Sequence, residues 1–378
     1  MKMKTKSFLL FSTSVFAISL FLIIFHSQPP QSFQSIVTQT HQHIKDFQVS
    51  LSQEQLRDEE EQHLVQEERY LRLVGLEGPT EVWHNTTVPV LITHARNDDH
   101  ALVIAFIHDM AHLPYTILVY NLGLKPYSLA MVSNYCNSSK CAVVDFDLEL
   151  FPSHVSDESI TAFRPLIIQH ALSRVGGVVY CAPAQRWAGS ARALAALWAR
   201  AGGAGSLGVL GWARRAAVTS LTHPRMFHYL RADPDDFLFV QMLDVARLLL
   251  APRPALGALM RHWVQCALTL DCIMPIGAQS AGCRFDKKPQ YRYSGCHGQD
   301  ASALSIILGA RSGFDEARYA VRGAAGWRRA PGNRTRDERT ERAATPPAAR
   351  ATRATRATRA TRATRATRAT TRARTPQV

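Results

Sequence analysis

Basic and aromatic side chains are interleaved in residues 284–308, "RFDKKPQYRYSGCHGQDASALSIIL". Cationic groups such as Arg284 and Lys287 suit an anionic ligand, and aromatic groups beside them suit a sugar. His297 and Asp300 follow, directly before an apolar run that predicts a helix. One interpretation gives Asp300 a purely structural role, in which its carboxylate interacts favourably with the dipole at the start of that helix.

Asp145 and Asp147 form a second candidate site in the segment "VVDFDLE". An Asp-x-Asp pair after an apolar strand is a common way to hold Mn²⁺ or Mg²⁺ against a diphosphate, because hard cations prefer carboxylate oxygens. The alternation of apolar and acidic residues also fits an edge strand whose acids face solvent. Both interpretations stay open.

His108 and His112 stand four residues apart in "IHDMAH", with Asp109 between them. This spacing resembles the zinc-protease pattern H-E-x-x-H, in which both imidazoles face one metal ion. The pattern requires Glu where this chain has Asp109, and a third ligand further along. Two histidines on a partly buried helix are the alternative interpretation, and a membrane-tethered zinc hydrolase is the activity that the pattern would imply.

Apolar strands and amphipathic helices alternate between residues 88 and 181. We expect strands at 88–95, 115–123, 141–149 and 178–181, and helices at 98–114, 125–136 and 160–177. This alternation predicts an α/β fold with a mainly parallel central sheet and helices on both faces. Ligands of such sheets bind beyond the carboxyl ends of the strands. The Ala-, Gly- and Arg-rich stretch 188–217 has poor periodicity and permits no assignment.

The first 80 residues predict a membrane anchor and a stem. Three lysines precede an apolar run at 8–25, which is near the minimum length for a membrane-spanning helix and predicts a cytoplasmic tail at 1–7. A cleaved signal peptide is the alternative, and no small-x-small cleavage site follows the run. Residues 26–80 are rich in Gln and Glu and predict a solvated helical stem, with a weak coiled-coil dimer as the alternative.

The basic charge lies mainly in the C-terminal tail. The chain carries a net charge of +14, and residues 331–378, with 13 Arg and 3 acidic residues, account for +10 of it. Six tandem Ala-Thr-Arg copies fill 351–368 and offer no apolar face, so we expect a disordered tail at 326–378. A basic folded surface is therefore not indicated, and we expect no nucleic-acid partner.

Cysteines and glycosylation sequons are consistent with an oxidising, lumenal environment. Sequons occur at Asn85, Asn137 and Asn333. Six cysteines are disulfide candidates whose pairing the sequence does not fix: Cys136, Cys141, Cys266, Cys272, Cys283 and Cys296. Cys181, the seventh, is expected to be a buried free thiol.

Two segments resemble glycosyltransferases of the GT-A fold. "FRPLIIQHALSRVGGVVYCAPAQRW" has the layout in which an Arg-bearing helix precedes a strand whose tip reads Y-L-D-x-D in that fold, and "CHGQDASAL" is similar to its D-Q-S-A-L-N-like helix start. "FPSHVS", "THPRMFHYL" and the cysteine-bearing segment 262–308 resemble a family of animal type II membrane proteins that is grouped with nucleotide-diphospho-sugar transferases. The resemblance covers about residues 80–320.

The resemblance implies a GT-A-like domain at 81–325 that transfers a sugar from a nucleotide-sugar to a glycan or glycoprotein in the Golgi or ER lumen. His94 and Arg96 would border the nucleotide, and Arg164 would contact its diphosphate or sugar. Arg284 and Lys287 would neutralise the diphosphate. Asp300, with His297 beside it, would be the catalytic base or the acceptor contact.

The strand tip that should carry the metal-binding acids departs from the family pattern. Positions 182 and 184, where the pattern has Asp, are both Ala, and Asp145 and Asp147 lie one strand earlier. A metal-dependent transfer would lose its main electrostatic stabilisation without these carboxylates. The alternatives are a transferase that uses basic residues in place of Mn²⁺ or Mg²⁺, and a catalytically inactive binding or scaffold protein on the same fold.

Overall fold

A computed structural model of the chain describes residues 13–21, 68–84, 86–280, 292–293, 295–323 and 326–330. It contains two compact units, Met1–Glu68 and Arg69–Val378. In the first unit, residues 13–21 form a helix with exposed side chains. Within the part of the chain that the structure describes, no helix combines the length and apolar character needed to span a bilayer. The described helix covers only half of the expected span at 8–25, so the span stays a prediction.

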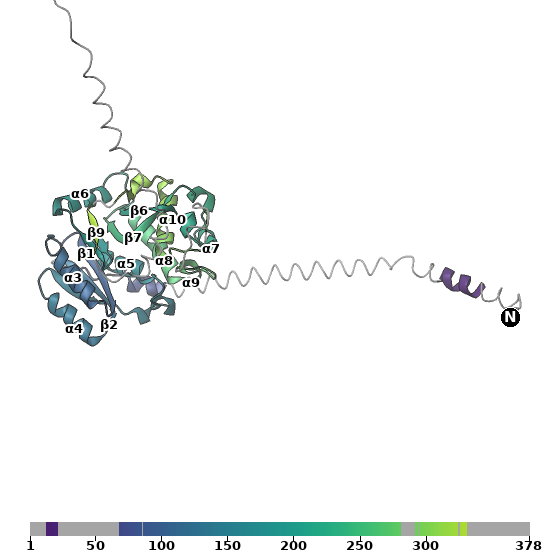
Figure 1. The fold of residues 1–378 in the computed structure, drawn as a ribbon, viewed down its shortest axis with the longest axis horizontal. Helices are drawn as coiled ribbons and strands as arrows, with labels where there is room; N and C mark the ends of the chain where they lie inside the picture. The colour runs from purple at the N-terminus through teal and green to yellow at the C-terminus, as the bar shows by residue number, and fades with distance from the viewer. Residues whose placement is uncertain are drawn as a thin grey trace, which may run out of the picture. The chain divides into compact units, whose positions relative to one another are not determined.

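A seven-stranded sheet forms the centre of the second unit (Figure 1). Its order is β3-β2-β1-β4-β7-β6-β8. The strands β3, β2, β1 and β4 run parallel to one another, β7 is antiparallel to both β4 and β6, and β8 is parallel to β6. In that order the strands are Cys141–Asp145, Ile117–Leu124, Val90–Asn97, Val178–Cys181, Gln241–Leu250, Val209–Ala217 and Ala320–Val321.

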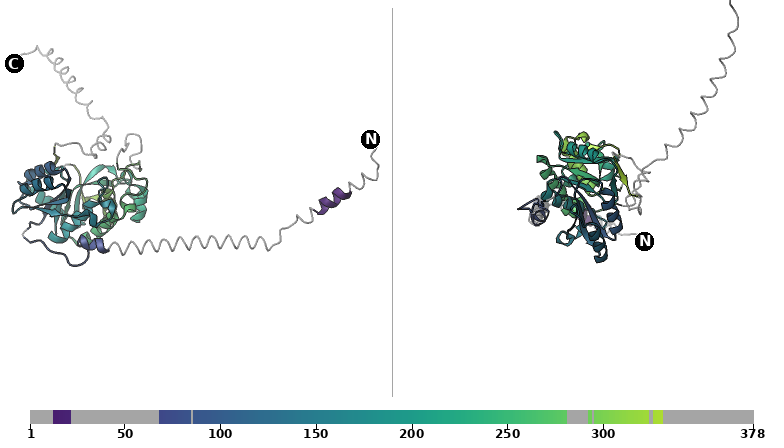
Figure 2. Two further views of the ribbon diagram at one scale, coloured as in Figure 1. Left: turned by 90° about the horizontal axis from the view of Figure 1, so that it is seen from below. Right: turned by 90° about the vertical axis from the view of Figure 1, so that its left-hand side faces the viewer.

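Helices cover both faces of this sheet (Figures 1 and 2). One core contains buried residues of α5 (Phe163–Val175), α8 (Pro254–Leu268) and α10 (Asp300–Ser312). The core on the opposite face contains residues of α3 (His100–Met110), α4 (Pro126–Tyr135) and α6 (Ala191–Ala201). The second unit also contains the short helices α7 (Pro224–Tyr229) and α9 (Leu270–Ile273). Alternate residues of the strands point into the two cores, as Leu91 and Ile92 do.

The predicted α/β class with a mostly parallel sheet is confirmed. Each strand and helix expected between 88 and 181 forms, with its ends shifted by a few residues. α5 ends where Gly176 adopts a φ of 78°, a conformation that glycine reaches without steric cost. The chain can therefore turn directly into β4, whose four residues are all buried.

The stretch 188–217, left unassigned above, contains two regular elements. α6 begins at the cap of Ser190, whose side chain accepts from the backbone N–H of Ala193, and it buries Leu194 and Ala201. β6 then runs between β7 and β8 inside the sheet. The fold also extends beyond the expected limits of 81 and 325. Leu71 and Val74 are buried in the core, and β9 (Trp327–Arg329) pairs with β5 (Gln185–Trp187).

Two disulfides lie within the described residues. Cys136–Cys141 closes the turn between α4 and β3, and Cys266–Cys272 joins the end of α8 to α9. Cys296 is also disulfide-bonded, whereas Cys283 lies outside the described residues. Cys181 is free and buried, as expected, and burial raises the pKa of its thiol.

Candidate functional site

The strand order reverses between β1 and β4. β1 is followed in the chain by β2 on one side, and β4 lies on its other side, which gives the order 3-2-1-4 of a doubly wound sheet. Open sheets of this kind bind ligands at the carboxyl ends of the strands at such a reversal. His94 lies near the end of β1 and Tyr180 near the end of β4, and their rings are stacked with centroids 6.1 Å apart.

A chain of hydrogen bonds starts at these two rings and crosses to the helices. The Tyr180 hydroxyl lies 3.2 Å from Nδ1 of His94 and accepts from Nε of Arg164, also at 3.2 Å. Nη1 of Arg164, in the first turn of α5, donates to Oδ2 of Asp300, the first residue of α10. Because Tyr180 accepts from Arg164, its own proton is available to Nδ1 of His94. The structure thus brings together three residues that the sequence selected: His94, Arg164 and Asp300.

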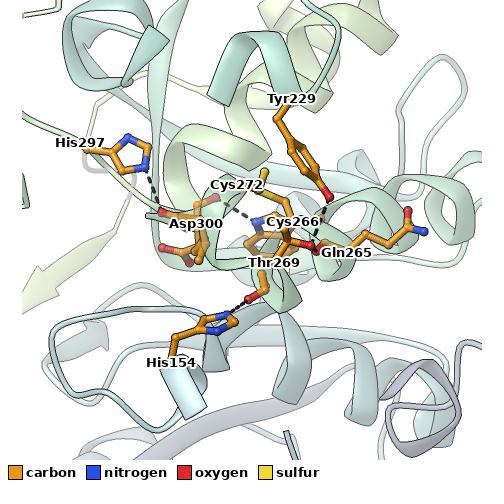
Figure 3. The surroundings of a disulfide bond; sticks show 11 residues. His154, Tyr229, Gln265, Cys266, Thr269, Cys272, His297 and Asp300 are labelled. Atoms are coloured by element: carbon orange, nitrogen blue, oxygen red, sulfur yellow. Dashed lines mark hydrogen bonds between the residues drawn. A yellow bond between two sulfur atoms is a disulfide. The ribbon is translucent and has the colours of Figure 1, made fainter. Parts of the chain in front are cut away.

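Hydrogen bonds hold both the side chain and the backbone of Asp300. Its side chain is 1% exposed, against 11% for Arg164. Oδ1 accepts from the hydroxyl of Thr161, and the backbone carbonyl accepts from Nε1 of Trp263 at 2.9 Å. Figure 3 shows Asp300 beside the Cys266–Cys272 disulfide, which closes the turn after α8. The carboxylate is therefore the buried end of the hydrogen-bonded chain, and it fixes the guanidinium of Arg164.

Burial determines the protonation of this cluster. It lowers the pKa of His94 to about 3, with the positive charges of Arg164 and Arg96 acting in the same direction. Burial raises the pKa of Tyr180 to about 12 and also raises the pKa of Asp300, which Arg164 and Thr161 oppose. The imidazole and the phenol are consequently neutral at physiological pH, and the ion pair between Arg164 and Asp300 holds the formal charges.

Two guanidinium groups lie near one aromatic ring at the edge of the cluster. Those of Arg96 and Arg164 lie 6.0 and 5.9 Å from the centroid of Phe163, which also packs against His94. Nη2 of Arg96 donates to the carbonyl of Ser156. Asp300 is the counter-charge of Arg164, and the pKa of the Asp157 carboxyl is lowered by its hydrogen bonds and by the positive charge of Arg96. The guanidinium groups of this edge therefore have acidic neighbours with which an anionic ligand would compete.

His297 lies outside the hydrogen-bonded chain, although it is close to Asp300 in sequence. Its Nε2 donates to the carbonyl of Ile273 at 3.0 Å, and its Nδ1 accepts from the backbone N–H of His223 at 3.2 Å. Burial lowers the pKa of His297 to about 4. Both ring nitrogens are thus hydrogen-bonded to backbone groups. The imidazole therefore connects the loop before α10 to the loop before α7 and to α9.

The acidic pair at the end of β3 and directly after it makes two separate structural contacts. Oδ1 of Asp145 accepts from the Asn121 side chain at 2.8 Å. Oδ1 of Asp147 accepts from the backbone N–H of Glu149 at 2.8 Å and caps a short 3₁₀ turn. β3 is the edge strand of the sheet. Within the ranges given above, no group of three or more His, Cys, Asp or Glu side chains is placed to hold a metal ion.

The tip of β4 is built from backbone contacts. The N–H of Ala182 donates to the carbonyl of Ala246 on β7, and the N–H of Gln185 donates to the carbonyl of Ala182, both at 2.8 Å. The side chains at positions 182 to 184 are Ala, Pro and Ala, none of which offers an oxygen to a cation. This donor set does not fit the Mn²⁺ or Mg²⁺ that the family resemblance implies.

The zinc-protease interpretation of His108 and His112 is wrong. Helix α3 ends at Met110, so His112 lies beyond it, with Nδ1 bonded to the carbonyl of Asp109 at 2.9 Å. Oδ2 of Asp109 accepts from Nε of the fully buried Arg186 at 2.9 Å. Asp109, which lies between the two histidines, therefore forms an ion pair with Arg186 that the zinc-protease pattern does not include.

Several participants were not selected from the sequence, and some selected residues cannot be placed. Tyr180 was missed because it reads as an ordinary buried strand residue, and Thr161 because it fell inside the helix expected at 160–177, whereas α5 begins at Phe163. Thr161 and Arg164 stand three residues apart and meet one carboxylate, a spacing that could have signalled their shared role. The predicted donor-binding residues Arg284 and Lys287, and the sequons at Asn85 and Asn333, lie outside the described residues.

Comparison with known proteins adds a set of low-similarity structural matches. No family model and no curated protein matches the chain. Apo mouse xyloside xylosyltransferase 1 aligns with 63% of this chain and 85% of its own, at 9% identity and a TM-score of 0.34. Galactosyltransferase LgtC, in complex with donor and acceptor sugar analogues, aligns with 58% of this chain and 70% of its own, at 12% identity and a TM-score of 0.35.

A third structural match is also low in sequence identity and in TM-score. Mannosyltransferase PcManGT from Pyrobaculum calidifontis, in complex with GDP-Man and Mn²⁺, aligns with 50% of this chain and 51% of its own, at 12% identity and a TM-score of 0.28. All three matched proteins are glycosyltransferases. TM-scores of this size do not identify the family of this chain.

Proposed function

We propose that the chain binds a nucleotide-sugar donor at the carboxyl edge of the sheet between β1 and β4, and transfers its sugar to a glycan or glycoprotein. The observation that carries this proposal is the hydrogen-bonded chain of His94, Tyr180, Arg164 and Asp300 at the reversal of strand order. Polar and charged groups from two strands and two helices converge there, at the place where doubly wound sheets bind ligands.

The roles follow from the contacts of each residue. Arg96, whose guanidinium lies 6.0 Å from the centroid of Phe163, would contact a phosphate of the donor. His94 would border the nucleotide as a neutral imidazole. Arg164 would orient toward the diphosphate or the sugar, and Asp300 would act through Arg164 as a positioning residue. A base role for Asp300 would require Arg164 to move away, because the two side chains form an ion pair.

A binding or scaffold protein is the second candidate function. The specific observation in its favour is the tip of β4, where Ala182, Pro183 and Ala184 stand in place of metal-binding acids. Donor binding without turnover would support this candidate. Transfer of labelled sugar to an acceptor would exclude it.

Removal of the Arg96 guanidinium tests the donor site. We expect Arg96→Gln to weaken binding of the nucleotide-sugar about 10-fold, because a charge-assisted hydrogen bond to a phosphate is lost. Isothermal titration calorimetry of the full chain measures this loss. Arg192→Gln, which alters an exposed arginine on α6, is the matched control and should leave the affinity unchanged. Equal affinity of wild type and Arg96→Gln would remove Arg96 from the site.

We also propose that the chain is a single-pass type II protein of the Golgi or ER membrane, with a stem that can mediate dimerisation. The apolar run at 8–25, which three lysines precede, and the two disulfides support this proposal. Asn137 is exposed in the turn between α4 and β3, where a glycosylation enzyme could reach it.

Glycosylation at Asn137 tests the lumenal location. We expect an endoglycosidase to increase the gel mobility of protein from a eukaryotic secretory host, because removal of each N-linked glycan lowers the mass. Asn137→Gln should reduce this shift by one glycan. A wild-type chain that does not respond to the endoglycosidase would contradict the lumenal location.

A further inference from the structure

A second charged cluster lies at the same edge of the sheet, on β6 and β7. Oδ1 of Asp244 lies 3.6 Å from Nη2 of Arg214, and Oδ2 of Asp244 lies 3.2 Å from Nη2 of Arg247. Arg247 is paired with Cys181 across the β4–β7 ladder, and its neighbour Ala246 accepts from the N–H of Ala182. The cluster therefore lies directly beside the tip of β4 that lacks acidic residues.

The cluster has more positive charge and more donors than it can satisfy. Two guanidinium groups share the single carboxylate of Asp244, which leaves a formal charge of +1. Nε of Arg214, Nε of Arg247 and Nε1 of Trp212 are buried, and none has a hydrogen-bond acceptor among the residues that the structure describes. The guanidinium of Arg247 lies 5.3 Å from the centroid of the Trp212 ring, so the unsatisfied groups belong to one assembly.

All the unsatisfied groups of this assembly are N–H donors. Trp327, whose ring lies 5.6 Å from that of Trp212, adds a buried Nε1 that also lacks an acceptor within the described residues. Buried polar groups normally have partners, so an unsatisfied set usually indicates a missing ligand or water. A set composed only of donors, with a net positive charge, selects an acceptor-rich anion over a cation or a neutral sugar.

We propose that Arg214, Arg247 and Trp212 form a binding site for a phosphate or diphosphate anion. The side chains of Arg214 and Arg247 are 32% and 17% exposed, so a small anion can reach them from solvent. Carboxylates at positions 182 and 184 would repel such an anion, and this chain has alanine at both. The identification of the anion as the diphosphate of a sugar donor rests on the proposed function, whereas the anion site itself does not.

Inorganic pyrophosphate is the probe that tests the site. Calorimetric titration of the full chain should show saturable binding, which Arg247→Gln should weaken about 10- to 100-fold because a charge-assisted contact is lost. Arg214→Gln should act in the same direction. Arg322→Gln, which alters an arginine that is 82% exposed and paired with Glu316, should bind like wild type. Asp244→Asn should tighten binding, because it removes the carboxylate that competes with the anion.

The response to Asp244→Asn separates two cases. Tighter pyrophosphate binding indicates an anion site, whereas in a purely structural ion-pair cluster the substitution would only weaken the cluster. No saturable pyrophosphate binding, or equal binding by wild type and Arg247→Gln, would overturn the proposal and leave ordered water as the partner of the buried donors. A parallel titration with UDP, GDP and CMP distinguishes the two proposals. Pyrophosphate binding that requires Arg247, without binding of any of these nucleotides, would retain the anion site and contradict the donor site. Nucleotide binding that is unchanged by Arg247→Gln, without Arg247-dependent binding of pyrophosphate, would retain the donor site and contradict the anion site.

Discussion

Arg164→Ala should lower the free energy of unfolding by about 3–5 kcal/mol, because it leaves the buried carboxylate of Asp300 without its counter-charge. The transfer of a carboxylate from water into a protein interior is costly, and the guanidinium contact offsets that cost only while both partners are present. The remaining donors to the Asp300 carboxylate, the hydroxyl of Thr161 and the backbone N–H of Ala301, are neutral. Urea denaturation of the wild type and the variant, compared at equal m-values, measures the difference.

A double substitution separates the ion pair from the packing around it. Arg164→Met combined with Asp300→Leu replaces both charges with apolar groups, and we expect it to recover at least about 2 kcal/mol of the loss. The exposed ion pair between Lys125 and Asp98 is the matched control. Its side chains are 68% and 67% exposed, so Lys125→Ala should cost less than about 1 kcal/mol. A loss of that small size for Arg164→Ala would mean that Asp300 is not a buried charge.

The second large effect is a steep loss of stability as the pH falls below about 6.5. Burial lowers the pKa of His94 and His170 to about 3 and that of His297 to about 4. In the unfolded chain these imidazoles titrate near 6.5. Between the two values the unfolded state binds protons that the native state does not, so falling pH favours unfolding.

The size of this effect follows from proton linkage. Each such histidine contributes a slope of about 1.4 kcal/mol per pH unit, so the three together give about 4 kcal/mol per unit just below pH 6. The slope decreases near pH 4, where native His297 begins to bind its proton. Asp300 acts in the opposite sense above the ordinary carboxyl pKa of about 4, because burial raises the pKa of its carboxyl in the folded state, so it offsets part of the histidine slope.

Histidine variants test this assignment. Denaturation curves at several pH values between 7 and 4.5 give the slope for the wild type. We expect His170→Gln, which removes the imidazole whose Nδ1 contacts the Tyr120 hydroxyl, to reduce the slope by about 1.4 kcal/mol per pH unit. His108→Gln is the control, because the side chain of His108 is 85% exposed. A wild-type stability that does not change between pH 6.5 and 5 would contradict the burial of neutral imidazoles.

The sequence predicted the first half of the sheet well because the signals there are local. Buried strands such as β4 and helix ends such as Gly176 are encoded by residues that are close together in the chain. β6 was not predicted because its second half, "ARRAA", carries Arg214, which is retained by the ion pair with Asp244 on β7. β9 was not predicted because its anchor, Trp327, packs against Trp187, which is distant in sequence.

The sequence indicated the carboxyl ends of the strands as the place of the candidate site, and it indicated only some of the residues that contact one another there. The resemblance to GT-A glycosyltransferases, together with the position of each residue in the chain, selected His94, Arg164 and Asp300. The ion pair between Arg164 and Asp300 joins residues 136 positions apart, so no local pattern could show that they hold each other. The same reason explains why Tyr180, which links His94 to Arg164, was treated as a core residue.

The most direct test of the donor site is a thermal-shift measurement on the full chain, purified from an oxidising secretory host, with UDP-, GDP- and CMP-sugars and with or without Mn²⁺. A donor present at 100 times its dissociation constant stabilises the folded state by about 2.7 kcal/mol. For a domain of this size we expect the melting temperature to rise by roughly 5–10 °C. Because the tip of β4 lacks carboxylates, the shift should not require Mn²⁺. A protein that melts cooperatively and shows no shift with any of these donors would contradict a nucleotide-sugar site.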